Sequence, residues 1–194
     1  MIHRYKRRRN KSGAMAAEYV ATMWLLFLFL FFPILNLATT GVNAFFLWFC
    51  TNCAATAGAK CQCFMAAVQI PALTGTWFPG AYDTARTKAN QIQGMFPGIG
   101  WVPSPTNPEV DILLNPIDPL GGLSPVTWTG PGAYPTGLPR PDPDLYTLML
   151  RVTIQGWASP LISCPWFDIP GLSKPMNLIM SSQAQFENPP GLLY

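Results

Sequence analysis

The sequence predicts an α+β protein in which a long N-terminal transmembrane helix precedes a small proline-rich domain with a short antiparallel sheet. Three observations lead to this prediction. An apolar run follows a cationic N-terminus, prolines and glycines crowd the middle of the chain, and two segments near the C-terminus alternate apolar and polar residues. The composition agrees, since 11% of the 194 residues are charged, where about a quarter is typical of soluble domains.

The basic residues are concentrated at the N-terminus. Six of the twelve lie before Gly13, namely Arg4, Lys6, Arg7, Arg8, Arg9 and Lys11. Because this run borders an apolar stretch, we expect it to orient a membrane helix by the positive-inside rule and not to bind nucleic acid. The sequence therefore predicts that residues 1–13 form a cytoplasmic leader and that the C-terminal part is exported.

The apolar run begins at Ala14 and continues to Phe32, close to the roughly 20 residues that span a bilayer as a helix. Pro33 removes a backbone donor and is expected to kink this helix. Alanine-rich segments then favour helix up to Pro71. We therefore predict one helix over residues 14–70, with its transmembrane half at about 14–36. A separate second span over residues 42–58 is the alternative, and it would return the C-terminus to the cytoplasm.

Residues 71–194 are predicted to form the exported domain. Prolines and glycines over residues 71–144 permit only short elements there. Residues 145–155 alternate between apolar and polar side chains except at Leu145 and Met149, as a half-buried strand does, and residues 177–186 nearly so. The two strands are expected to pair in a small antiparallel sheet.

Glu18 is the only acidic residue in the first 82 residues, and it lies inside the start of the apolar helix. An ionisable group in a membrane helix is costly, so it suggests a function and needs a partner. If a peptidase cut between Gly13 and Ala14, the new α-amino group would lie four residues from Glu18. In a bundle of identical helices, a neighbour's amine could then pair with this carboxylate in a low dielectric.

This arrangement resembles a type IV prepilin processing site. The longer pattern Gly13-Ala-Met-Ala-Ala-Glu18-Tyr-Val, followed by Leu25-Leu and Pro33, is similar to the TadE/TadG minor pseudopilins of the tight-adherence (Flp) pilus system. The resemblance covers residues 11–36 and extends, more weakly, over 145–187, where Leu150-Arg-Val-Thr-Ile154 and the segment ending at Glu187 resemble that family's closing strands and terminal glutamate.

The resemblance implies a structural role in assembling a pilus or a related secretion filament for adhesion. It implies that a prepilin peptidase cuts between Gly13 and Ala14 and that Glu18 guides assembly with other pilin-like subunits. It also implies a single-pass protein of the bacterial inner membrane, with its N-terminus in the cytoplasm and its C-terminal domain in the periplasm or outside the cell. No cofactor and no nucleic-acid partner are expected.

Five cysteines form a second group of interest: Cys50, Cys53, Cys61, Cys63 and Cys164. On a continuous helix the first three would share one stripe, and helical neighbours rarely offer disulfide geometry. We expect these cysteines to serve mainly as small apolar packing residues. The alternative is an intermolecular or long-range disulfide, for example to Cys164. A metal site is not expected, because paired CxxC knuckles are missing and His3 is the only histidine.

No residue pattern predicts an enzyme. Asp142 and Asp144 lie in a proline-rich loop and are typical of turns. Two other hypotheses stay open. The chain could be a signal-anchored or secreted envelope binding module with no filament role, or a small envelope enzyme that uses Asp142, Asp144 and Asp168.

Overall fold

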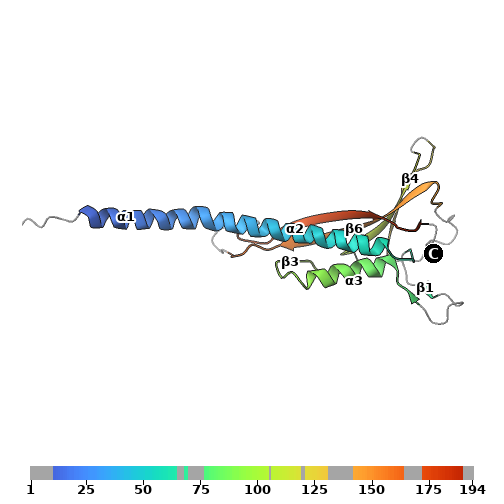
Figure 1. The fold of residues 1–194 in the computed structure, drawn as a ribbon, viewed down its shortest axis with the longest axis horizontal. Helices are drawn as coiled ribbons and strands as arrows, with labels where there is room; N and C mark the ends of the chain where they lie inside the picture. Colours follow the sequence, from blue (N-terminus) through green and yellow to red (C-terminus); the bar gives the residue numbers. More distant parts are fainter. Residues whose placement is uncertain are drawn as a thin grey trace, which may run out of the picture.

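The computed structural model describes residues 11–64, 68–69, 77–104, 106–118, 121–130, 142–163 and 172–189. It confirms the α+β class: one long apolar N-terminal helix leads into a small domain built on an antiparallel sheet. Figure 1 shows that the sheet and a short helix pack along the distal half of the long helix, whereas the proximal half stands clear of the domain.

The long helix consists of α1 (Lys11–Leu26), a π-helical turn η1 (Phe27–Phe31) and α2 (Phe32–Ala59). At 1.5 Å per residue this rod is about 70 Å long, more than twice the hydrocarbon thickness of a bilayer. The rod runs in one direction from end to end (Figure 1). Residues 42–58 therefore belong to the same helix as the apolar run, and the alternative of a separate second span is wrong.

The helix continues through Pro33, and the residues before it adopt the π turn. Proline has no N–H, and its ring crowds the carbonyl one turn earlier. Here the N–H of Phe32 donates to the carbonyl of Phe27, five residues back, and Pro33 falls in the first turn of α2. The wider turn places the proline where its missing donor is tolerated.

The sheet is organised around its longest strand, β6 (Tyr146–Ala158). One edge of β6 pairs with β7 (Met176–Gln185), and the other pairs with β4 (Glu109–Pro116) and the two-residue β3 (Ile99–Gly100). β5 (Val126–Thr129) extends the sheet beyond β4. All these pairings are antiparallel, and a separate two-stranded ladder joins β1 (Val68–Gln69) to β2 (Trp77–Phe78).

The core lies between the distal half of α2, one face of the sheet and α3 (Ala81–Gln93). Small residues on both helices bring their backbones close together. The buried core residues include Leu47, Cys50, Ala54 and Ala55 of α2, Ala81, Ala85 and Ala89 of α3, and Leu148, Leu150, Val152 and Ile154 of β6. Gly58 marks the closest approach, because a Cβ there would lie 3.0 Å from the carbonyl oxygen of Ala81 and would overlap Leu150.

The helix ends at Ala59 and not near residue 70, so the predicted span of 14–70 is too long. The N–H of Cys61 donates to the carbonyl of Gly58 at 3.1 Å, and the chain turns away. This turn places Phe64 in the core, 2% exposed and 5.8 Å from the ring of Phe186. Burial of that aromatic side chain favours an end of the helix before residue 64.

The two predicted strands are confirmed, with observed bounds of 146–158 and 176–185 in place of 145–155 and 177–186. Alternate residues of each face the core as expected. The expectation of only short elements over residues 71–144 is wrong, because α3 and the eight-residue β4 lie there. The spacing of Ala81, Ala85 and Ala89 is the helical signal that the surrounding prolines and glycines obscured.

We predict that Gly58→Ala destabilises the domain, because the added methyl group has no room between α2, α3 and β6. Gly41→Ala is the matched control on the same helix, since a Cβ there meets nothing within 4 Å. Chemical unfolding of the full chain in detergent should place Gly58→Ala about 1–3 kcal/mol below Gly41→Ala. Equal stability of the two variants would contradict the close packing at Gly58.

Candidate functional site

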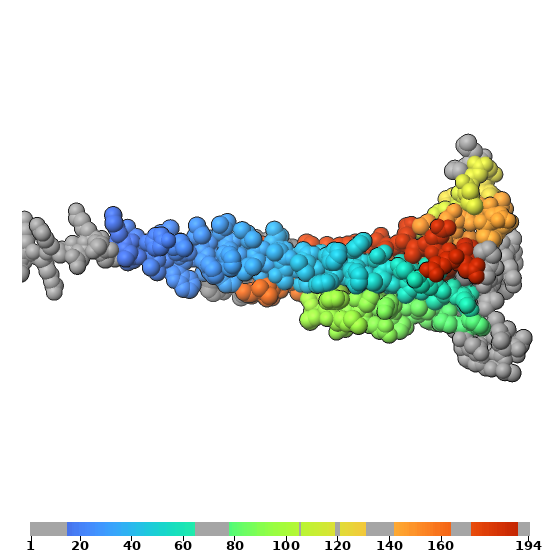
Figure 2. Space-filling view, viewed as in Figure 1, coloured from blue at the N-terminus to red at the C-terminus, as the bar shows by residue number. Residues whose placement is uncertain are grey.

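The proximal half of the long helix exposes apolar side chains all round. From Met15 to Phe31 every residue is exposed, including Trp24 at 63% and Phe29 at 63%. Figure 2 shows this stretch projecting from the domain. Within the part of the chain that the structure describes, Met15–Ala59 is one helix long and apolar enough to cross a membrane. A helix that is apolar on every face is suited to lipid and not to water.

The predicted processing and assembly residues all lie at the start of this helix. Gly13 and Ala14 belong to the first turn of α1, and Glu18 follows one turn later. The side chain of Glu18 is exposed, and its carboxylate forms no ion pair with any residue that the structure describes. Ala14 and Glu18 are separated by about 6 Å along the helix axis. A carboxylate in an apolar helix of this kind is costly to bury in lipid unless a cation pairs with it.

The free and packed halves of the helix meet at Asn36, which sequence reasoning did not single out. Asn36 is 6% exposed, and its amide nitrogen donates to the carbonyls of Ile162 (3.0 Å) and Leu172 (2.7 Å). Its side-chain oxygen accepts from the N–H of Ile162 at 3.1 Å. These three bonds fasten two separate segments of the domain to the helix. The signal in the sequence was an asparagine that follows more than 20 residues of apolar helix.

Asn43 makes a second connection two turns further along. Its amide donates to the carbonyl of Ser159 at 2.7 Å, and the N–H of Ser159 donates to the carbonyl of Gly98 at 2.8 Å. A Cβ at Gly98 would overlap the Asn43 side chain, so a larger residue there would displace this amide. The turn that follows β6 is therefore held on α2 by two asparagines.

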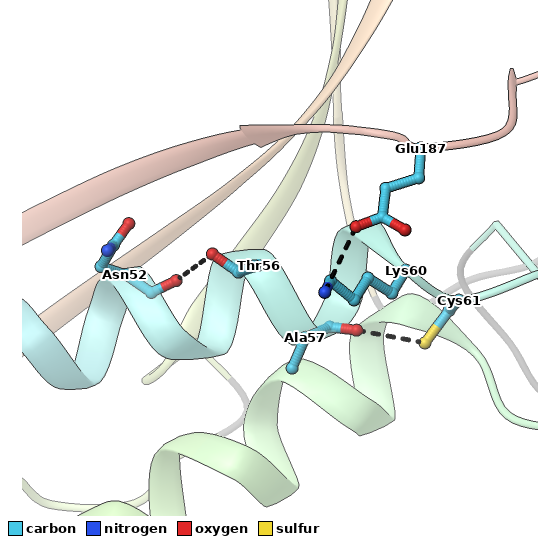
Figure 3. Close-up of polar contacts among 6 residues, drawn as sticks. All are labelled: Asn52, Thr56, Ala57, Lys60, Cys61 and Glu187. Atoms are coloured by element: carbon cyan, nitrogen blue, oxygen red, sulfur yellow. Dashed lines mark hydrogen bonds and ion pairs between the residues drawn. The ribbon is translucent and has the colours of Figure 1, made fainter.

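The other end of α2 is tied to the C-terminal strand (Figure 3). The N–H of Glu187 donates to the carbonyl of Ala59 at 3.3 Å, which satisfies one free carbonyl at the helix end. The carboxylate of Glu187 lies 3.3 Å from the amine of Lys60, and both side chains are more than half exposed. Exposed pairs of this kind contribute about 0–1 kcal/mol. Glu187, the residue that resembles the family's terminal glutamate, thus joins β7 to the helix.

A partly buried ion pair between β4 and β6 was also missed. Asp111 and Arg151 lie directly opposite each other in the register of the two strands, and the Nε of Arg151 donates to Asp111 Oδ2 at 3.0 Å. Asp111 is 2% exposed. The pair lies on the sheet face away from α2. The sequence pattern predicted Arg151 within a strand, but it did not link Arg151 to Asp111.

The cysteines that the structure describes are all free thiols: Cys50, Cys53, Cys61 and Cys63. Cys50 is fully buried in the core and donates to the carbonyl of Ala89, as a small packing residue does. The prediction that Cys50, Cys53 and Cys61 share one stripe of a helix is wrong for Cys61, because the helix has already ended at Ala59. Cys164 lies outside the described residues, so a disulfide to it stays a prediction. Among the described residues, no group of three or more histidine, cysteine or acidic side chains could hold a metal.

Among the carboxylates of the enzyme hypothesis, that of Asp142 has a local structural role. Asp142 Oδ1 accepts from the N–H of Asp144 at 2.8 Å, and the carbonyl of Asp142 accepts from Leu145 and Tyr146. These bonds build the turn that starts β6. Asp168 lies outside the described residues.

No family model, curated protein or solved structure matches this chain. The features that bear on function are the free half of the helix, the acidic residue near its start and the connections that fix the domain to its other half.

We predict that Asn36→Ala loosens the turn after β6, because the N–H of Ile162 and two carbonyls lose their partner. The expected loss is about 1–3 kcal/mol of unfolding free energy, with faster hydrogen exchange at residues 159–163. Leu37→Ala, at a neighbouring position that is 64% exposed, is the control and should change neither. Unchanged exchange in Asn36→Ala would show that the asparagine does not hold this turn.

Thiol reactivity provides a further test of the packing. Burial, and secondarily the nearby Cys53, raises the pKa of Cys50 from 9.0 to about 12. Iodoacetamide at pH 8.5 should therefore modify the partly exposed Cys53 while Cys50 stays unmodified until the chain is unfolded in urea. Since the unfolded thiol ionises near pH 9 and the folded one does not, stability should also fall as the pH rises from 9 towards 12. Equal labelling of both thiols in the folded chain would contradict the buried position of Cys50.

Proposed function

We propose that this protein is a minor pseudopilin-like structural component that helps to assemble a tight-adherence-type pilus or a related secretion filament. The observation that carries the proposal is Glu18, a carboxylate in the exposed apolar half of the helix, five residues after Gly13 and without an ion-pair partner among the described residues. The architecture supports it, since a free apolar helix that carries a compact domain on its far half can join neighbours side by side.

In this proposal a prepilin peptidase removes residues 1–13 and frees the amine of Ala14. A neighbouring subunit shifted by about one helical turn, roughly 6 Å, brings its amine beside Glu18. The two charges attract strongly in the low dielectric of a membrane or a helix bundle, so assembly offsets the cost of burying the carboxylate. Removal of the leader also takes away six basic residues that would repel their copies.

The proposed location follows from the same features. The cationic leader stays in the cytoplasm by the positive-inside rule, the apolar half of the helix crosses the bacterial inner membrane, and the domain lies in the periplasm or outside the cell. The partners are the membrane, the peptidase and other pilin-like subunits. No observation in the described residues favours the binding-module hypothesis. Under that hypothesis the mature protein would either retain the leader or lose the whole helix.

We predict that Glu18→Gln leaves leader removal intact but strongly reduces lateral assembly, because the neighbour's amine loses its charged partner. N-terminal sequencing of the membrane-extracted protein should begin at Ala14 in both forms. Cross-linking in whole cells should yield multimers for the wild type and mainly monomers for Glu18→Gln.

Glu187→Gln is the matched control, since it makes the same chemical change in an exposed pair far from the apolar half of the helix. It should assemble as the wild type does, and Glu18→Asp should restore part of the assembly because it keeps the charge. An N-terminus that retains the basic residues, or normal multimers from Glu18→Gln, would reject the pseudopilin role.

A further inference from the structure

The turn after β6 presents two apolar side chains where the free half of the helix meets the domain. Leu161 is 59% exposed and Ile162 is 42% exposed, although the backbone of Ile162 is held by Asn36 on both its N–H and its carbonyl. The turn is therefore fixed in place while its apolar side chains face outward. The turn thus offers two adjacent apolar side chains, held in a fixed position, to whatever lies beside the helix at this height.

The rise of the helix gives the distance between the start of the apolar run and this turn. From Met15 to Asn36 the rise is about 32 Å at 1.5 Å per residue, and the hydrocarbon core of a bilayer is about 30 Å thick. If Lys11 and the basic residues before it remain at one membrane surface, Asn36 reaches the opposite surface. Ile162 is hydrogen-bonded to Asn36, so it lies at the same depth.

We propose that Leu161 and Ile162 form a membrane-contact site that seats the domain on the lipid surface through which its own helix emerges. The partner is the interfacial region of a phospholipid bilayer, into which the two apolar side chains insert. This inference rests on the membrane crossing in the proposed function, and it does not depend on leader cleavage or on filament assembly.

The position of the turn in the fold favours lipid over another protein. In Figure 1 the end of β6 points back along the helix towards α1, while the β4–β5 end of the sheet lies farthest from it. Exposed apolar residues also occur at that far end, for example Val126 at 44%. Of these two sets, the one beside Asn36 lies at the height of the membrane surface, so the two sets should behave differently in a bilayer.

The site gives the domain a fixed orientation. Asn36 and Asn43 hold the turn on the helix, and insertion of Leu161 and Ile162 into lipid adds a second point of membrane contact beside the helix. Two contacts restrict the tilt of the helix and the rotation of the domain above the membrane. Each copy would then present the same face of its domain to a neighbour.

The test places the photo-cross-linking residue benzoylphenylalanine at single positions of the full chain in phosphatidylcholine–phosphatidylglycerol vesicles. Leu161 and Ile162 are the test positions, Val126 is the matched exposed control, and Leu25 reports the membrane span. Mass spectrometry then counts lipid and protein adducts. We expect lipid adducts at Leu25, and several-fold more at Leu161 and Ile162 than at Val126. An unchanged pattern of limited proteolysis verifies the fold of each variant.

Two outcomes would overturn the inference, and they are distinguishable. Lipid adducts at Leu25, with Leu161 and Ile162 no more reactive towards lipid than Val126 or linked to another copy of the chain, would reject the membrane-contact site alone. Absence of lipid adducts at Leu25 would reject the membrane crossing and, with it, both the site and the proposed function.

Discussion

The unequal burial of the two halves of one helix is the constraint on which the rest of the structure depends. Between Met15 and Phe31 the helix presents only exposed side chains, nearly all of them apolar. From Asn36 to Ala59 one stripe of the same helix is buried on the sheet and α3. Water is a poor solvent for the first half, so this half requires lipid or partner helices, whereas the second half requires its own domain.

The packed half explains why the domain folds where it does. Small residues such as Ala54, Ala55 and Gly58 let α2 approach β6 and α3 closely, so the helix is itself part of the core of the domain. The connections at Asn36 and Lys60 then fix the two ends of the packed stretch. The helix and the domain are consequently one unit, and a displacement of the helix through the membrane would carry the domain with it.

The sequence predicted the features that depend on periodicity and composition. The apolar run, its position after a basic segment, and the faces of β6 and β7 follow directly from residue patterns, as in the alternation of Leu148, Leu150 and Val152. Glu18 was recognisable because a carboxylate is rare in such a run. These signals are local, so one segment of the chain suffices to detect them.

The remaining features depend on contacts between distant segments. The helix stops at Ala59 because Phe64 must reach the core near Phe186, and no local pattern records that contact. α3 was hidden among prolines and glycines, since alanines at 81, 85 and 89 give a weak apolar signal. Asn36 gains its role from Ile162 and Leu172, which are 126 and 136 residues away in the sequence.

The division of the helix can be measured directly by hydrogen exchange of the full chain, first in lipid nanodiscs and then in detergent micelles. Amides of residues 15–35 should exchange much more slowly in the bilayer than in micelles, while those of residues 43–59 should exchange equally slowly in both, because the domain protects them. Equal exchange of residues 15–35 in the two media, or a lipid dependence confined to residues 43–59, would contradict the division of this helix into a lipid-facing half and a domain-packed half.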